Sequence, residues 1–129
     1  MSKKVLVVDD DPDVRSFVVT VLEENQYTPL VAVDGVEGLE MIEKEKPDLV
    51  ILDVLMPRGS GIRLYRHLKT DDTLKTIPVI MFTGIALRSF LKSQKALEEF
   101  KGEKVPEPDI YLEKPVEPQE LVDAIRKKI

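Results

Sequence analysis

The feature that most constrains the fold is a set of short runs in which consecutive residues, and not alternate ones, are hydrophobic. Four such runs lie at residues 5–8, 49–52, 79–82 and 110–112. Strands that are apolar on both sides are typical of a parallel sheet, because helices then cover both of its faces. A fifth run, at residues 28–33, is less apolar and contains Pro29, which suits an edge strand. The chain is therefore predicted to contain five parallel strands.

Segments with apolar residues at helical spacing separate and follow these strands. Five such segments are present. The first covers residues 12 to about 25, and the second begins at 34–35 and ends before Pro47. The third begins at a cap at Ser60, the fourth covers about 86 to 100, and the fifth covers 121 to 129. Asp11 followed by Pro12 is a typical helix start, with a capping side chain and then proline at the first helical position. Alternating strands and helices predict an α/β fold, a doubly wound three-layer sandwich with right-handed crossovers, in one domain spanning residues 1–129.

Charged side chains stand just beyond three of the predicted strands. Asp9 and Asp10 follow the first strand, Asp53 follows the third, and Lys114 comes soon after the fifth. In an open parallel sheet, ligands and chemistry collect outside the carboxyl ends of the strands. These residues should therefore converge on one small site. Three carboxylates and one ammonium group suit a divalent cation and a phosphoryl group.

Four motifs in order resemble the receiver domain of bacterial two-component response regulators. They lie at residues 7–12, 48–61, 79–84 and 111–115, and the similarity runs from Lys3 to the end of the chain. The resemblance implies a flavodoxin-like sheet with strand order 2-1-3-4-5, which agrees with Pro29 at an edge. It also implies a switch that accepts a phosphoryl group from a sensor histidine kinase or a phosphotransfer protein and then signals to a downstream protein whose identity is unknown.

The residues of the site fit this chemistry one by one. Asp53 is the candidate nucleophile, since a carboxylate can form an aspartyl phosphate. Mg²⁺ (or Mn²⁺) would be bound directly by Asp10 and Asp53 and through water by Asp9, and the resemblance adds the backbone carbonyl of Leu55. Lys114 offers a positive charge to a phosphate oxygen.

Two further positions complete the predicted machinery. The Thr83 hydroxyl can donate a hydrogen bond to another phosphate oxygen. Tyr111 matches the family's switch aromatic, which moves together with Thr83 and alters the face built from the fourth helix, fifth strand and fifth helix. The resemblance also implies a cis peptide bond between Lys114 and Pro115.

One segment departs from the family pattern. The stretch from Thr83 to Lys114 is longer than in most receivers, and residues 101–108 replace the usual turn before the fifth strand. Two prolines and four charges predict an extended, exposed connector after a lengthened fourth helix, with Gly102 as its C-cap. This insertion either alters partner choice or is a tolerated surface excursion, and the sequence favours neither.

Rival functions fit the residues less well, so the chain is not expected to be an enzyme. An aspartyl-nucleophile, Mg²⁺-dependent phosphatase would need a second acid two residues after Asp53, where this chain has Leu55. A non-phosphorylated, flavodoxin-like binding module would need a Ser/Thr/Gly-rich loop in place of Asp9 and Asp10. The only histidine, His67, is expected to be solvated and cannot supply a histidine-based metal site.

Composition excludes several other classes of function. A net charge of -5 without a basic stripe argues against a nucleic-acid partner, and the absence of cysteine excludes thiolate chemistry. No apolar stretch approaches the roughly 20 residues that span a bilayer, so no membrane partner is expected. The first residues run directly into a strand without a signal peptide, which leads us to expect a cytoplasmic protein, either acting alone or cut from a longer one.

Overall fold

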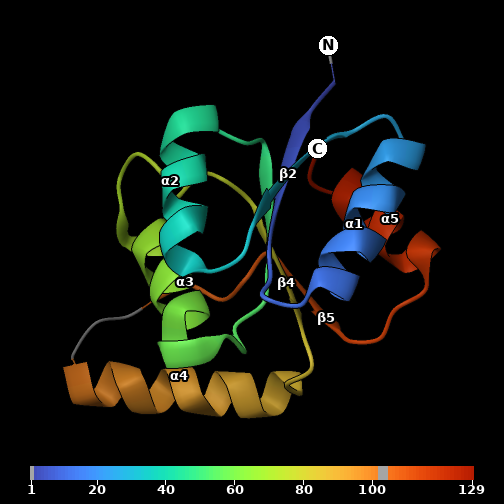
Figure 1. The fold of residues 1–129 in the computed structure, drawn as a ribbon. Coiled ribbons are helices and arrows are strands. Elements are labelled where there is room, and N and C mark those ends of the chain that lie inside the picture. Colours follow the sequence, from blue (N-terminus) through green and yellow to red (C-terminus); the bar gives the residue numbers. More distant parts are fainter. Residues whose placement is uncertain (1, 102–104) are drawn as a thin grey trace.

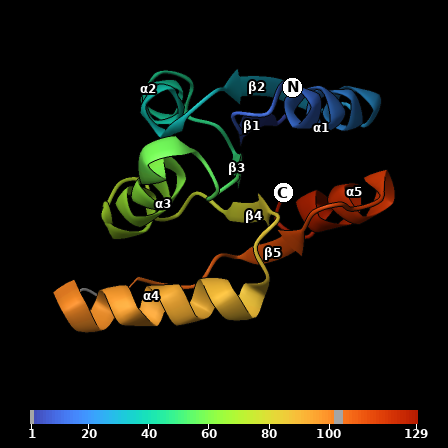
Figure 2. The same cartoon turned by 60° about the horizontal axis from the view of Figure 1, so that its bottom comes forward.

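Five parallel strands form one sheet in the computed structural model (Figure 1). Their order is β2-β1-β3-β4-β5, as labelled in Figure 2. The model describes residues 2–101 and 105–129, and side chains are described outside residues 96–104. The strands are β1 (Lys4–Val8), β2 (Thr28–Ala32), β3 (Leu49–Leu52), β4 (Val79–Thr83) and β5 (Ile110–Glu113). The predicted order is confirmed, and Pro29 lies on the edge strand β2.

Helices cover both faces of the sheet, as expected for a doubly wound fold (Figure 2). The helices are α1 (Pro12–Glu24), α2 (Gly35–Glu45), α3 (Ser60–Thr70), α4 (Leu87–Lys101) and α5 (Pro118–Arg126). α1 and α5 pack on one face, and α2, α3 and α4 pack on the other. The predicted three-layer architecture is therefore confirmed.

The strands alternate their side chains between two hydrophobic clusters, one on each face. In β1, Val5 and Val7 pack with α1 and α5, whereas Leu6 and Val8 pack with α2 and α3. All four side chains are at most 1% exposed. Burial on both faces explains why the strands appear in the sequence as unbroken apolar runs.

α1 and α3 begin in different ways, and the prediction for α3 is wrong in one detail. The Asp11 side chain caps α1 as predicted, by accepting a hydrogen bond from the amide of Asp13. Ser60 does not cap α3. A short 3-10 turn, η1 (Pro57–Gly59), precedes this helix, and Gly59 occupies the cap position with a φ of 66°. Glycine is favoured there because this left-handed conformation costs it nothing.

The segment before β5 is anchored to the domain, which corrects in part the prediction of an extended, exposed connector. Val105 is 7% exposed and belongs to the cluster on the α2–α3 side of the sheet. The Tyr65 hydroxyl of α3 donates a hydrogen bond to the carbonyl of Pro106. One apolar residue between charges and prolines gives no periodic signal, so the sequence did not reveal this anchor. The predicted cap at Gly102 lies outside the described residues.

Truncating Val105 should therefore cost stability. We expect Val105→Ala to lower the free energy of unfolding by about 2 kcal/mol, because it leaves a cavity in the core. Val36 is 68% exposed, and Val36→Ala is the matched control, expected to change stability by less than about 0.5 kcal/mol. Urea unfolding of both variants measures the difference. Equal stabilities would show that Val105 is not an anchor.

None of the described helices has the length and hydrophobicity needed to cross a lipid bilayer.

Candidate functional site

The carboxyl ends of β1, β3 and β5 place four charged side chains side by side, those of Asp9, Asp10, Asp53 and Lys114. The amide of Asp53 donates to the carbonyl of Val8 over 3.0 Å, which fixes the end of β3 next to the end of β1. The amide of Lys114 donates to the carbonyl of Thr83 over 2.8 Å, which does the same for β5 and β4. The parallel ladder thus brings together residues that are far apart in the sequence.

Three carboxylates form a compact cluster at this edge. One oxygen from each of Asp9, Asp10 and Asp53 lies within 4.8 Å of the others. Asp9 and Asp53 are buried, at 1% and 5% exposure, whereas Asp10 is exposed. All three donors are oxygens, which suits a hard divalent cation such as Mg²⁺ better than a softer metal. The predicted convergence of the acids is confirmed.

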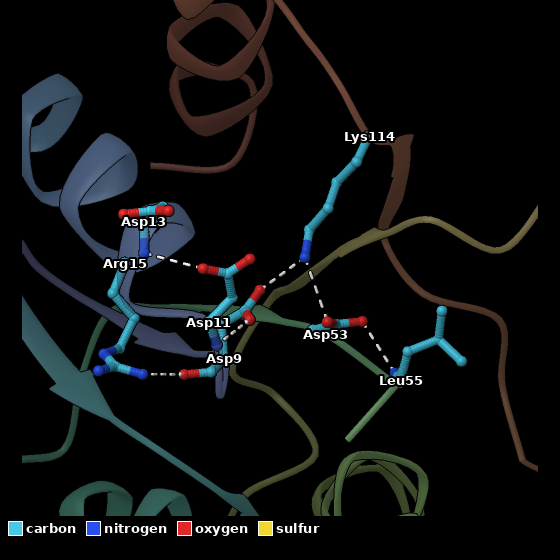
Figure 3. Close-up of polar contacts among 7 residues, drawn as sticks. All are labelled: Asp9, Asp11, Asp13, Arg15, Asp53, Leu55 and Lys114. Carbon is cyan, nitrogen blue, oxygen red and sulfur yellow. Dashed lines mark hydrogen bonds and ion pairs between the residues drawn. The ribbon is translucent and has the colours of Figure 1, made fainter. Parts of the chain in front are cut away.

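Lys114 joins the two buried carboxylates (Figure 3). Its ammonium nitrogen lies 2.8 Å from Oδ2 of Asp9 and 3.1 Å from Oδ2 of Asp53. It also lies 5.4 Å from the centre of the Phe82 ring. The peptide bond between Lys114 and Pro115 is cis, as the resemblance implied. One cation thus compensates two buried negative charges.

Burial and ion pairing shift the pKa values of Asp9 and Lys114. Burial raises the pKa of Asp9, and it outweighs the lowering effect of the hydrogen bonds from Lys114 and Asp11. Burial alone would lower the pKa of Lys114, but the hydrogen bond to Asp9 and the charge of Asp53 outweigh it, so that its pKa is raised. The lysine is therefore held firmly in its charged form.

The turn between β1 and α1 is held by further polar contacts, also drawn in Figure 3. The amide of Asp11 donates to Oδ1 of Asp9 over 2.9 Å. Arg15, on the first turn of α1, donates from Nη1 to the backbone carbonyl of Asp9 over 2.8 Å. Sequence reasoning missed Arg15, although its place one helical turn after Asp11 could have indicated it. These contacts fix the backbone that carries Asp9 and Asp10.

The segment after β3 is organised in the same way. The amide of Leu55 donates to Oδ1 of Asp53 over 2.8 Å, so a backbone amide two residues away orients the Asp53 carboxylate. The Leu55 side chain is 54% exposed.

His67, as predicted, is exposed, and it lines a groove of about 700 Å³ between α2 and α3.

Thr83 and Tyr111 lie close to the cluster in the fold but make other contacts. Thr83 is fully buried, and its hydroxyl has no hydrogen-bond partner among the described residues. The Tyr111 hydroxyl donates to the carbonyl of Ile85 over 2.6 Å, and its ring packs on Phe90 of α4 at 5.5 Å between centroids. Burial, with smaller effects from Glu113 and Asp53, raises the pKa of Tyr111 to about 12.

Comparison with known proteins decides the family. The family model of the response regulator receiver domain matches residues 5–126. The chain belongs to this family. Receiver domains are signalling domains of two-component systems that interact with histidine kinases, and they are not a family of catalytic enzymes. The prediction that this chain is not an enzyme is therefore confirmed, and membership of the family disfavours the phosphatase.

The curated relatives of this receiver domain are longer proteins. The phosphate regulon transcriptional regulatory protein PhoB of Escherichia coli is 33% identical over 126 residues, which cover 98% of this chain and 51% of PhoB. The DNA-binding dual master transcriptional regulator RpaA of Synechocystis is 30% identical over 123 residues, covering 95% of this chain and 47% of RpaA. The chain thus spans about half the length of these regulators.

Solved structures share the complete fold. The CheY-like receiver domain protein of Methanospirillum hungatei superposes with a TM-score of 0.79 at 30% identity, over 99% of this chain and 94% of that one. The chemotaxis protein CheY4 of Vibrio cholerae superposes with a TM-score of 0.83 at 26% identity, over all of both chains. The flavodoxin-like, CheY-type fold of this receiver domain is therefore confirmed.

Proposed function

We propose that this receiver domain accepts a phosphoryl group on Asp53 from a sensor histidine kinase or a phosphotransfer protein, in a reaction that requires Mg²⁺ or Mn²⁺. The observation that carries the proposal is the position of Lys114 between the buried carboxylates of Asp9 and Asp53. A buried nucleophile beside a second acid and a fixed cation is what phosphoryl transfer requires, because such catalysis depends mainly on positioning and on charge compensation. The proposal assigns this function to one domain, residues 1–129.

The chemical step is a displacement at phosphorus. A carboxylate oxygen of Asp53 forms the new O–P bond while the bond from phosphorus to the donor's imidazole nitrogen breaks, and the imidazole leaves with its electron pair. The amide of Leu55 holds Oδ1 of Asp53 at 2.8 Å and so orients the nucleophile. No separate base is needed, since a carboxylate oxygen has no proton to lose when it attacks phosphorus.

The acid cluster is the proposed metal site. A bound Mg²⁺ would compensate charge on the transferring phosphoryl oxygens. Asp10 and Asp53 would bind it directly, together with the carbonyl of Leu55, and Asp9 would act through water. The exposure of Asp10, beside two buried acids, leaves an open side for the metal and its remaining waters.

Three further residues would bind the phosphoryl group or respond to it, namely Lys114, Thr83 and Tyr111. Lys114 is already held at the cluster and can bind a phosphate oxygen as a point charge. The buried hydroxyl of Thr83 has no hydrogen-bond partner among the described residues and can donate to another oxygen. Tyr111 connects β5 to the loop after β4 and to Phe90 of α4, so its movement would alter the α4–β5–α5 face.

The partners and the cellular location of the chain belong to the proposal as well. The α4–β5–α5 face would signal to a downstream protein in the cytoplasm, with no direct contact to nucleic acid or membrane. The DNA binding named for RpaA is a property of that longer regulator, of which this chain matches 47%.

The experiment that tests the proposal is incubation with acetyl phosphate in Mg²⁺ and, in parallel, in excess EDTA. Intact mass should increase by one phosphoryl group in Mg²⁺ and stay unchanged in EDTA. Equal labelling in both, or none in either, would contradict a Mg²⁺-dependent phosphoacceptor.

The aspartyl phosphate is predicted to be long-lived. In this family the residues two past the acceptor and two past the threonine influence the entry of attacking water. Here they are Leu55 and Ile85, and neither side chain can orient water by hydrogen bonding. We expect Leu55→Asn to increase the decay rate about tenfold, measured as loss of phosphoprotein after removal of the donor. Leu55→Met is the matched apolar control, and an unchanged rate in Leu55→Asn would contradict the prediction.

A further inference from the structure

Gly61, in the first turn of α3, lies against the backbone of the proposed phosphoacceptor. A Cβ atom at this position would lie 2.3 Å from the carbonyl oxygen of Asp53 and 2.8 Å from Cα of Val54. Both neighbours are backbone atoms, so no rotation of a side chain could relieve the overlap. The close approach of α3 to the end of β3 therefore requires glycine.

α3 cannot simply withdraw from Asp53, because the other side of its first turn is also occupied. A Cβ atom on Gly35, at the start of α2, would lie 2.2 Å from the carbonyl oxygen of Ser60. The amide of Gly35 also donates to the hydroxyl of Ser60 over 3.3 Å. Further along α3, Leu64 and Leu68 are at most 3% exposed. α3 is thus held between α2 and the end of β3.

The backbone that Gly61 meets lies where the chain leaves the sheet, in the segment from Asp53 to Leu55. Strand β3 is fixed up to the amide of Asp53, which donates to Val8. Beyond it the chain leaves the sheet, and the Leu55 side chain is exposed. Any pressure from α3 should therefore displace the peptide between Asp53 and Val54.

We propose that Gly61 is a positioning residue: its missing side chain lets the α3 backbone set the orientation of the Asp53 carboxylate. This inference rests on the proposed function of Asp53 and names a second residue on which that function depends. Displacing the peptide would move the carboxylate away from Lys114, which lies 3.1 Å from it, and away from Asp9 and Asp10. It would also move the backbone carbonyl of Leu55, so the metal site and the nucleophile would be disturbed together.

Gly61→Ala and Gly35→Ala form a matched pair for the test. Each adds one methyl group in the first turn of a helix, and each methyl meets a backbone carbonyl at nearly the same distance. Only the Gly61 methyl meets the backbone of Asp53. A purely structural role predicts that both variants lose similar stability and similar activity, whereas positioning predicts that they differ in function.

The measurements are Mg²⁺ affinity, from NMR titration of backbone amides, and the rate of phosphorylation by acetyl phosphate. Both are made on the full chain at low temperature in trimethylamine N-oxide, which favours the folded state. We expect Gly61→Ala to bind Mg²⁺ at least tenfold more weakly and to be phosphorylated at least tenfold more slowly. The Gly35 methyl presses on Ser60 and reaches Asp53 only through α3, and displacement of α2 can share that strain. We therefore expect Gly35→Ala to stay within threefold of the unaltered chain.

Three results would overturn the inference. Equal losses in the two variants would assign Gly61 to general packing, as would a Gly61→Ala chain that does not fold under these conditions. A folded Gly61→Ala chain with unaltered Mg²⁺ affinity and rate would show that the contact does not orient Asp53. Failure of the unaltered chain to take up phosphate would instead contradict the proposed function, and Mg²⁺ affinity would still decide the role of Gly61.

Discussion

Replacing Lys114 with methionine should destabilise the metal-free protein by about 3 kcal/mol, because removing one partner of a buried ion pair leaves uncompensated charge behind. Asp9 and Asp53 are nearly inaccessible to solvent, and Lys114 is the cation that contacts both. Methionine keeps most of the apolar stem, so the loss reports on charge and not on packing. Urea unfolding measures it. Lys75→Met, which removes an exposed ion pair with Asp72, is the control and should cost less than about 1 kcal/mol.

The pH dependence of this loss follows from the raised pKa of Asp9. The folded protein binds that proton more tightly than the unfolded chain does, so stability falls as pH rises from the unfolded carboxylate value of about 4 through the higher folded value. Without Lys114, the pKa of Asp9 in the folded protein should rise further. The deficit of Lys114→Met should therefore be small below about pH 4 and complete at neutral pH. Mg²⁺ should reduce the deficit at neutral pH, since ligands of the folded state stabilise it.

A deficit that does not change with pH or Mg²⁺ would contradict the charge explanation. It would indicate that Lys114 contributes mainly through the cation–π contact of its ammonium group with the Phe82 ring.

Replacing Asp10 with alanine should have opposite effects on phosphorylation and on stability. Phosphorylation should fall about 100-fold, because a proposed direct ligand of the metal is lost. The metal-free protein should become slightly more stable, by less than about 1 kcal/mol, because one of three neighbouring carboxylates is removed. The gain is small since Asp10 is exposed, while burial is the main cause of the raised pKa of Asp9.

Labelling by acetyl phosphate and thermal unfolding without metal measure the two effects of Asp10→Ala. Asp13→Ala is the control, because Asp13 lies in the first turn of α1 and outside the acid cluster. A lower melting temperature for metal-free Asp10→Ala, or full phosphorylation of this variant, would contradict the proposed arrangement of the pocket.

Two kinds of feature could be predicted from the sequence: strands whose buried residues form an apolar run, and side chains that directly follow the ends of those strands. β3 begins and ends at the predicted residues, and the acids after β1 and β3 meet as expected. Both follow from one cause, because strands buried on two faces leave a clear apolar pattern and fix where their carboxyl ends lie. The roles of Asp53, Thr83 and Lys114 in phosphoryl transfer, and of Thr83 and Tyr111 in the switch, stay predictions.

Features that depend on single contacts across the fold could not be predicted. The start of α3 depends on a left-handed turn at Gly59, and the anchor of the β5 connector depends on one valine and on the hydroxyl of Tyr65. Arg15 acts through a backbone carbonyl. Only the spacing of Arg15 from Asp11 is visible in the sequence. The other contacts leave no pattern there, since each depends on the distance between elements that only the fold brings together.

The central claim is that Asp53 is the residue that accepts the phosphoryl group, and peptide mapping of the labelled protein tests it most directly. The chain and its Asp53→Asn variant are incubated with acetyl phosphate and Mg²⁺, and the aspartyl phosphate is reduced with borohydride to mark its position. We predict a single modified residue, Asp53, in the unaltered chain and no modification in the folded Asp53→Asn variant. Modification of Asp9 or Asp10 in the unaltered chain, or equal labelling of the variant, would contradict the account.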